Sequence, residues 1–176
     1  MSDYPYPGIR PFTREETDIF FGREAQTDAL IARLGETRFL AVVGPSGCGK
    51  SSLVRTGMIA GLETGFLARA GAGWRVAEMR PGTAPFRNLA DALEAVYTES
   101  GASTPSTLST PSTAPASSTE TALRAGSLGL HKFLDAHPLP EGENLLIVAD
   151  QFEELFRYAD NDDARAEAAA FVSLLL

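Results

Sequence analysis

Apolar residues along the chain form short runs that alternate with helical patterns. Three runs have the length and composition of buried strands: residues 38–44, 74–79 and 144–150. The spacing of apolar residues predicts helices over 24–34, from Gly49 onward, over 86–97, over 122–136 and from Asp163. Strands that alternate with helices and are nearly continuous in apolar residues predict an α/β fold with a parallel sheet covered on both faces.

Residues 98–121 depart from this pattern. Seventeen of these 24 residues are Ser, Thr or Pro, and the only apolar residue larger than alanine is Leu108. Such a segment cannot bury enough apolar surface to offset the entropy lost on ordering, so we expect a disordered insertion. The predicted organisation is an N-terminal arm over residues 1–23 and a core over 24–176 that the insertion interrupts.

Composition narrows the class of protein. The chain has 176 residues, of which 44% are hydrophobic, and no apolar run is long enough to cross a bilayer. It shows no secretion signal, and its single cysteine cannot form an internal disulfide, so we expect a cytoplasmic protein. The net charge of −8 argues against a broad nucleic-acid-binding or membrane-binding surface, but it allows a small anion site.

The segment GPSGCGKS, residues 44–51, matches the phosphate-binding (Walker A) pattern G-x-x-x-x-G-K-[ST]. Glycines let the backbone curl so that N–H groups point at phosphate oxygens, and the following helix adds its dipole. We expect Lys50 to reach the β- and γ-phosphates and Ser51 to ligate Mg²⁺ through its hydroxyl. Cys48 is interpreted as a small side chain that fits a variable position of the loop, and modification of its thiol is the second interpretation. The predicted nucleotide-binding residues of this loop are Gly44, Pro45, Ser46, Gly47, Cys48, Gly49, Lys50, Ser51 and Ser52.

The third apolar run ends in LLIVAD, and Asp150 is the expected magnesium-organising (Walker B) acid. The alternative is that its carboxylate caps a helix. Gln151 stands where many phosphate-cleaving enzymes carry a glutamate, and it cannot act as a base. Glu153 and Glu154 follow, and either is a candidate for orienting the attacking water, with Glu153 the first choice. The alternative is that both are solvated acids that open a helix.

Four blocks in order carry a family resemblance: residues 6–24 (YPGIRPFTREETDIFFGRE), 38–58, 74–93 and 145–156. The chain resembles the novel STAND group of P-loop NTPases, signal-transduction ATPases related to the NACHT and AAA+ families. The resemblance implies a P-loop NTPase three-layer sandwich with a parallel sheet, here truncated after the Walker B strand. NACHT-like relatives place acids three and four residues after the magnesium aspartate, which implies Glu153 as the catalytic acid. Lys50 is also a candidate catalytic residue.

The segment FFGRE, residues 20–24, is similar to the segment that crosses the adenine face in related ATPases. That likeness implies Phe21, Gly22 and Arg23 as base-side contacts. The alternative from the residues alone is a hydrophobic staple before a helix that begins near Glu24. The segment RPG, residues 80–82, also recurs in the family, but neither the spacing nor the resemblance gives Arg80 a role.

The leading hypothesis is an ATP·Mg²⁺-binding core of a signalling switch, with ATP and ADP as ligands and self-association or sensor and effector domains as partners. Slow hydrolysis is expected only in a complete protein. The alternative is a non-catalytic regulatory fragment that modulates a full-length relative. A transporter ATPase ranks lower, because residues 131–144 hold no LSGGQ-like segment, and a nucleotide kinase ranks lower, because no tyrosine-rich segment offers an acceptor-nucleotide site. No NKxD-type guanine signature is present, which favours ATP over GTP.

Overall fold

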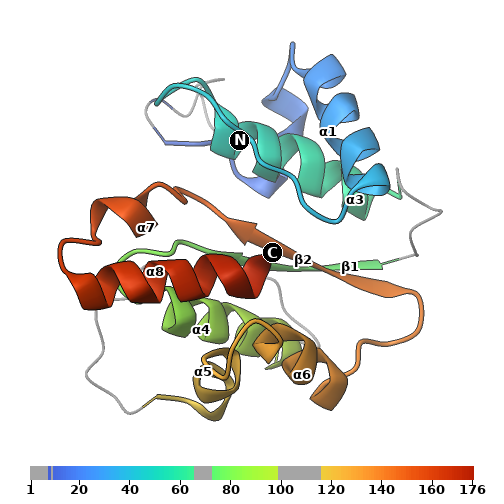
Figure 1. The fold of residues 1–176 in the computed structure, drawn as a ribbon. Coiled ribbons are helices and arrows are strands. Elements are labelled where there is room, and N and C mark those ends of the chain that lie inside the picture. Colours follow the sequence, from blue (N-terminus) through green and yellow to red (C-terminus); the bar gives the residue numbers. More distant parts are fainter. Residues whose placement is uncertain (1–7, 9, 66–72, 99–115) are drawn as a thin grey trace. The chain divides into compact units, whose positions relative to one another are not determined.

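The computed structural model describes residues 8, 10–65, 73–98 and 116–176, and these form two compact units (Figure 1). Unit 1 comprises Met1–Trp74 and Gly142–Asn144, and unit 2 comprises Arg75–Glu141 and Leu145–Leu176. Residues 1–7 and 9 of the predicted N-terminal arm lie outside the described residues, as does most of the predicted insertion. Among the described residues, none of the helices combines the length and apolar character needed to cross a bilayer.

Unit 1 is built from helices. Its elements are a 3₁₀ helix η1 (Arg14–Ile19), α1 (Glu24–Glu36), α2 (Lys50–Ser52), a π-helical segment η2 (Leu53–Ile59) and α3 (Ala60–Glu63). The last three are consecutive, so one helical run extends from the phosphate-loop motif to Glu63. The helices predicted from residue 24 and from Gly49 are confirmed.

Two glycines let α1 lie close to this helical run. A Cβ on Gly57 would collide with the Thr27 hydroxyl, and a Cβ on Gly61 would lie 2.6 Å from Ile31 Cδ1. The close approach buries Ile31 and Ile59, which are 4% and 0% exposed. Burying an aliphatic side chain of this size contributes roughly 1.5–3 kcal/mol. This packing holds the helix that follows the predicted phosphate loop.

Unit 2 contains the greater part of a two-stranded sheet and the helices that follow it. Its elements are β1 (Gly73–Met79), α4 (Pro85–Thr98), α5 (Ser118–Leu123), α6 (Gly129–Ala136), β2 (Glu143–Ala149), α7 (Glu154–Arg157) and α8 (Asp162–Leu175). The predicted strands over 74–79 and 144–150 and the helices over 86–97 and from Asp163 are confirmed. Asn161 caps α8, because its Oδ1 accepts a hydrogen bond of 2.8 Å from Ala164 N.

The two strands run parallel. Gly73 N donates to Gly142 O at 3.4 Å, and Asp150 N donates to Met79 O at 2.9 Å, so paired residue numbers rise together along both strands. Figure 1 shows the two arrowheads pointing the same way. Parallel neighbours need a long crossover connection, and α4, α5 and α6 lie in the connection between these two. The structure thus confirms the α/β class with a parallel pair.

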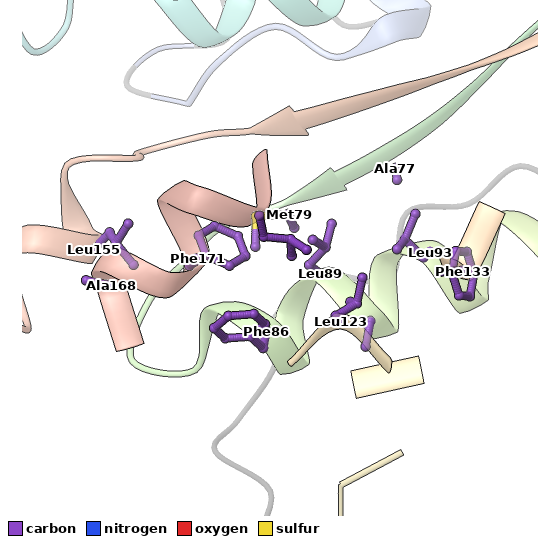
Figure 2. Close-up of a cluster of buried hydrophobic side chains, with 12 residues drawn as sticks. Ala77, Met79, Phe86, Leu89, Leu93, Leu123, Phe133, Leu155, Ala168 and Phe171 are labelled. Atoms are coloured by element: carbon purple, nitrogen blue, oxygen red, sulfur yellow. The ribbon is translucent and has the colours of Figure 1, made fainter. Parts of the chain in front are cut away.

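The core of unit 2 lies against one face of this sheet. Ala77 and Met79 of β1 are buried, and alternate residues of β2 (Leu145, Ile147 and Ala149) pack against the same cluster. The helices contribute Phe86, Leu89 and Leu93 from α4, Leu123 from α5, Phe133 from α6 and Phe171 from α8. Figure 2 shows these side chains gathered in one cluster. A single apolar core therefore joins both strands to the helices of the unit.

The predicted strand over 38–44 is not formed. Among the described residues the sheet consists of β1 and β2, and no helix or strand is assigned to 38–44. Leu40 and Val42 are half-buried, whereas Phe39 and Val43 are 60% and 89% exposed. The apolar run predicts burial, but a strand also requires a neighbour to pair its N–H and C=O groups, and apolarity does not encode that neighbour.

Two boundaries around the insertion were also wrong. Residues 118–121 belong to the helix α5, because Ser117 Oγ accepts from Glu120 N at 3.1 Å and the side chains of Thr119 and Glu120 are buried. The helix predicted over 122–136 is split between α5 and α6. Gly126 takes a left-handed φ of 119° in the break, where glycine costs least.

A buried carboxylate ties α5 to its neighbours. Glu120 is 5% exposed; Oε2 accepts from Arg87 Nε at 3.2 Å and Oε1 accepts from Arg124 Nε at 3.0 Å. Arg124 also donates to Glu167 of α8 at 2.6 Å and lies over the Phe86 ring. Burial by itself raises the pKa of Glu120, but the hydrogen bonds from Arg124 and Arg87 outweigh it and lower the pKa below its ordinary value.

We expect Glu120→Gln to destabilise the protein by about 1–3 kcal/mol near neutral pH, because two guanidinium groups lose their charged acceptor. A lowered folded pKa stabilises the fold above the ordinary glutamate pKa, and that contribution disappears as the pH falls through the folded value. Urea unfolding at about pH 7 and about pH 3 should therefore show the difference between variant and wild type shrinking in acid. Glu167→Gln, at a more exposed site, is the control and should cost under about 1 kcal/mol. An equal effect of Glu120→Gln at both pH values would contradict the ionic interpretation.

Candidate nucleotide-binding site

The predicted phosphate loop is a tight turn that leads directly into a helix. Gly47 and Gly49 have φ angles of 77° and 83°, in the left-handed region that other residues enter only at a cost. Gly49 is the N-cap residue, and α2 begins at Lys50. Gly44 also has little room, since a Cβ there would lie 3.0 Å from Cys48 Sγ. The glycine positions of the motif therefore match places where the backbone requires them.

Lys50 folds back over its own loop. Its Nζ donates to Gly44 O at 2.8 Å and to Pro45 O at 3.0 Å, and the side chain is half-buried. The ammonium is thus held at the start of the loop by two neutral carbonyl oxygens. A phosphate oxygen offers the same donor a charged acceptor, and such hydrogen bonds are shorter and roughly twice as strong. The arrangement suits exchange of these carbonyls for a phosphate.

The N-terminal segment braces the loop and its helix. Arg23 Nη2 donates to Cys48 O at 2.8 Å, so this predicted base-side residue contacts the loop backbone. Phe12 N donates to the hydroxyl of Ser52, which is 7% exposed, at 3.1 Å. Ser52 is therefore engaged by the N-terminal segment, while the neighbouring Ser51 is half-buried.

Phe21 and Gly22, the other predicted base-side residues, lie just before α1. The Phe21 side chain is 75% exposed, and Gly22 has a left-handed φ of 82°. The hydrophobic staple that was the alternative for this segment is not formed. The N-cap of α1 is Arg23, so the residue before the cap is Gly22, which has no side chain to pack. The Phe21 ring is exposed, and the contact of Phe21 and Gly22 with the base stays a prediction.

Asp150 lies at the carboxyl end of β2. Its N–H donates to Met79 O at the end of the paired strands, and its Oδ1 accepts from Gln151 N at 3.0 Å. Its side chain is 15% exposed and its Oδ2 is 3.8 Å from Arg80 Nη2. The helix-cap alternative is wrong for α7, whose N-cap residue is Glu153. Sequence reasoning gave Arg80 no role; the signal was its place directly after the strand adjacent to β2.

Asp150 and Ser51 carry oxygen donors of the kind that Mg²⁺ accepts. No cluster of three or more His, Cys, Asp or Glu side chains that could hold a metal occurs in the part of the chain that the structure describes. Mg²⁺ is commonly held by one or two carboxylates together with phosphate and water oxygens. Asp150 supplies a hard carboxylate in unit 2, and Ser51 supplies a hydroxyl in unit 1.

After Asp150 the chain turns sharply into α7. Gln151 has a φ of 55°, and it is the only non-glycine residue among those described that has a positive φ. Glu154 N donates to Gln151 O at 2.9 Å, which places both predicted catalytic acids at the first turn of α7. Glu153 is exposed and Glu154 is half-buried. The acids do open a helix, as the second interpretation held, and the catalytic role of Glu153 stays a prediction.

The left-handed backbone at Gln151 predicts how substitutions there change the free energy of unfolding. A residue with a Cβ pays about 1–2 kcal/mol there, and glycine does not, although glycine gains unfolded-state entropy. Gln151→Gly should therefore stabilise the protein by about 0.5–1 kcal/mol in urea unfolding. Gln151→Ala keeps the strain, removes the side chain, and should stay within about 0.5 kcal/mol of wild type. A glycine variant no more stable than the alanine variant would refute strain at this position.

Comparisons with known proteins agree with this chemistry. The family model Novel STAND NTPase 1 matches residues 5–176, which is nearly the whole chain. Two curated relatives, both named aliphatic sulfonates import ATP-binding protein SsuB, come from Yersinia pestis bv. Antiqua (strain Antiqua) and Yersinia pestis. Each is 45% identical over 57 residues, which cover 32% of this chain and only 20% of the relative. No solved structure matches the chain.

Proposed function

Because the chain belongs to the Novel STAND NTPase 1 family, we propose that it is the ATP·Mg²⁺-binding core of a nucleotide-dependent signalling switch. In this proposal the core adopts the three-layer P-loop arrangement. Binding and slow cleavage of ATP bias a two-state assembly with its sensor and effector partners. The family membership supports nucleotide chemistry, and the relatives named for ATP binding favour ATP over GTP.

The observation that carries the proposal is the loop that ends at Lys50. Two left-handed glycines curl the backbone, the helix begins at Lys50, and the lysine ammonium is held at the loop by weak neutral acceptors. Exposed N–H groups of such a turn and a helix N-terminus attract phosphate. The long helical run from Lys50 to Glu63 is anchored on α1, so the loop has a rigid base.

Each predicted residue has one task in this scheme. Lys50 holds the β- and γ-phosphates, and Phe21, Gly22 and Arg23 contact the base. Ser51 and Asp150 would hold Mg²⁺, which when bound neutralises charge on the phosphates. Glu153 orients the attacking water, with Glu154 as its neighbour at the start of α7. The end of β2 and the turn at Gln151 support the roles of Asp150 and Glu153, because the chain carries both acids out of the sheet at the same edge.

We expect Lys50→Ala to weaken ATP binding about tenfold to a hundredfold, because a charged hydrogen-bond donor to phosphate contributes about 1.5–3 kcal/mol. Calorimetric titration with ATP, ADP and GTP in the presence of Mg²⁺ measures this. The chain contains one other lysine, Lys132 in α6, and Lys132→Ala is the matched control that removes the same charge. Unchanged ATP affinity in Lys50→Ala would refute the phosphate site.

Glu153→Gln should preserve ATP affinity and slow ATP cleavage by about a hundredfold or more in the full-length protein, since only the base or water-orienting group is removed. Phosphate release gives the rate, and Glu154→Gln is the neighbouring comparison. If Glu154→Gln slows cleavage and Glu153→Gln does not, the role belongs to Glu154.

A further inference from the structure

The two parallel strands end side by side with residues of opposite charge. Arg80 directly follows Met79, the last residue of β1, and Asp150 directly follows Ala149, the last residue of β2. Asp150 N donates to Met79 O at 2.9 Å, so the strand ladder itself brings the two ends together. Arg80 Nη2 lies 3.8 Å from Asp150 Oδ2, within ion-pair range.

The backbone of Arg80 is clamped by α4. Asn88 Nδ2 donates to Arg80 O at 2.9 Å and to Pro81 O at 3.0 Å. Pro81 is fully buried, and Gly82 turns the chain with a left-handed φ of 52°. The segment RPG is therefore a rigid turn between β1 and α4, and it presents a half-exposed guanidinium to the carboxylate of the neighbouring strand.

We propose that Arg80 is the counter-ion of Asp150 in the metal-free protein, and that Mg²⁺ must displace its guanidinium to reach the carboxylate. The inference rests on the proposed function, in which Asp150 holds the metal. Arg80 is then a positioning residue that sets the Mg²⁺ concentration at which the nucleotide binds. It holds the carboxylate in place when no metal is present and releases it when Mg²⁺ arrives with ATP.

The charges determine in which direction Arg80 affects Mg²⁺ binding. Asp150 Oδ1 accepts a hydrogen bond from Gln151 N, and Oδ2 lies within ion-pair range of the Arg80 guanidinium. A divalent cation at either oxygen is repelled by the nearby guanidinium. Removing the charge should make Mg²⁺ more effective.

The first test titrates MgCl₂ into the protein at a constant ATP concentration and follows ATP binding by fluorescence of a labelled ATP analogue. Arg80→Ala should lower the Mg²⁺ concentration for half-maximal binding by about threefold to tenfold, as expected for a partly exposed charge acting on a divalent ion. Arg80→Lys keeps the charge and should restore a value close to wild type. Arg165→Ala removes the same charge from an exposed position on α8 and should leave the value unchanged.

The second test measures the pair without metal or nucleotide. Thermal unfolding in EDTA of Arg80→Ala, Asp150→Asn and the double variant forms a double-mutant cycle. Arg80→Ala should lower the melting temperature by about 1–3 °C when Asp150 is present and should have no effect in the Asp150→Asn background. Additive shifts would show that the two side chains do not interact and would overturn the proposal.

The outcomes separate this inference from the proposed function. Failure of the wild type to bind ATP would refute the nucleotide site and, with it, the role of Arg80 in metal entry. ATP binding by the wild type, with an equal or higher Mg²⁺ requirement in Arg80→Ala, would refute the role of Arg80 alone. A weaker ATP affinity of Arg80→Ala at saturating Mg²⁺ would also overturn it, because the guanidinium would then serve the nucleotide.

Discussion

The parallel pairing of β1 and β2 is the constraint on which the strand-end site depends. Parallel strands finish at the same edge of a sheet, so the hydrogen bond from Asp150 N to Met79 O brings Asp150 and Arg80 together without any further contact. The same strand end leads into the turn at Gln151 and the start of α7, where Glu153 and Glu154 lie. A shift of one residue in this pairing would turn the polar strand-end residues toward the apolar core.

The predicted phosphate loop depends on a different constraint, the packing of its helix. Gly57 and Gly61 allow α1 to approach the helical run that starts at Lys50, and Arg23 and Phe12 connect the N-terminal segment to the loop and to Ser52. The predicted phosphate-binding loop is rich in glycine and polar residues, while the residues that pack its helix against α1, Ile31 and Ile59, are apolar and buried.

Local patterns in the sequence predicted the elements whose signals are local. The glycines at 47 and 49, the helix from Lys50 and the strands that end at Met79 and Ala149 could all be read from spacing and apolarity. The failures involve partners distant in sequence. Residues 38–44 are as apolar as a strand, but nothing in the run specifies a pairing neighbour, and the buried Glu120 pairs with Arg87, which lies 33 positions earlier in the chain. The pairing of Arg80 with Asp150 was missed for the same reason, since the two lie 70 positions apart in the chain.

The proposed function requires the predicted phosphate loop and the strand-end aspartate to serve one magnesium nucleotide. The most direct measurement is ATP affinity with Mg²⁺ and with EDTA, in the wild type and in Asp150→Asn, whose side chain has the same size and no charge. A shared site predicts that Mg²⁺ tightens ATP binding in the wild type and has little effect in Asp150→Asn. An Asp150→Asn protein whose ATP affinity rises with Mg²⁺ as much as that of the wild type would contradict it.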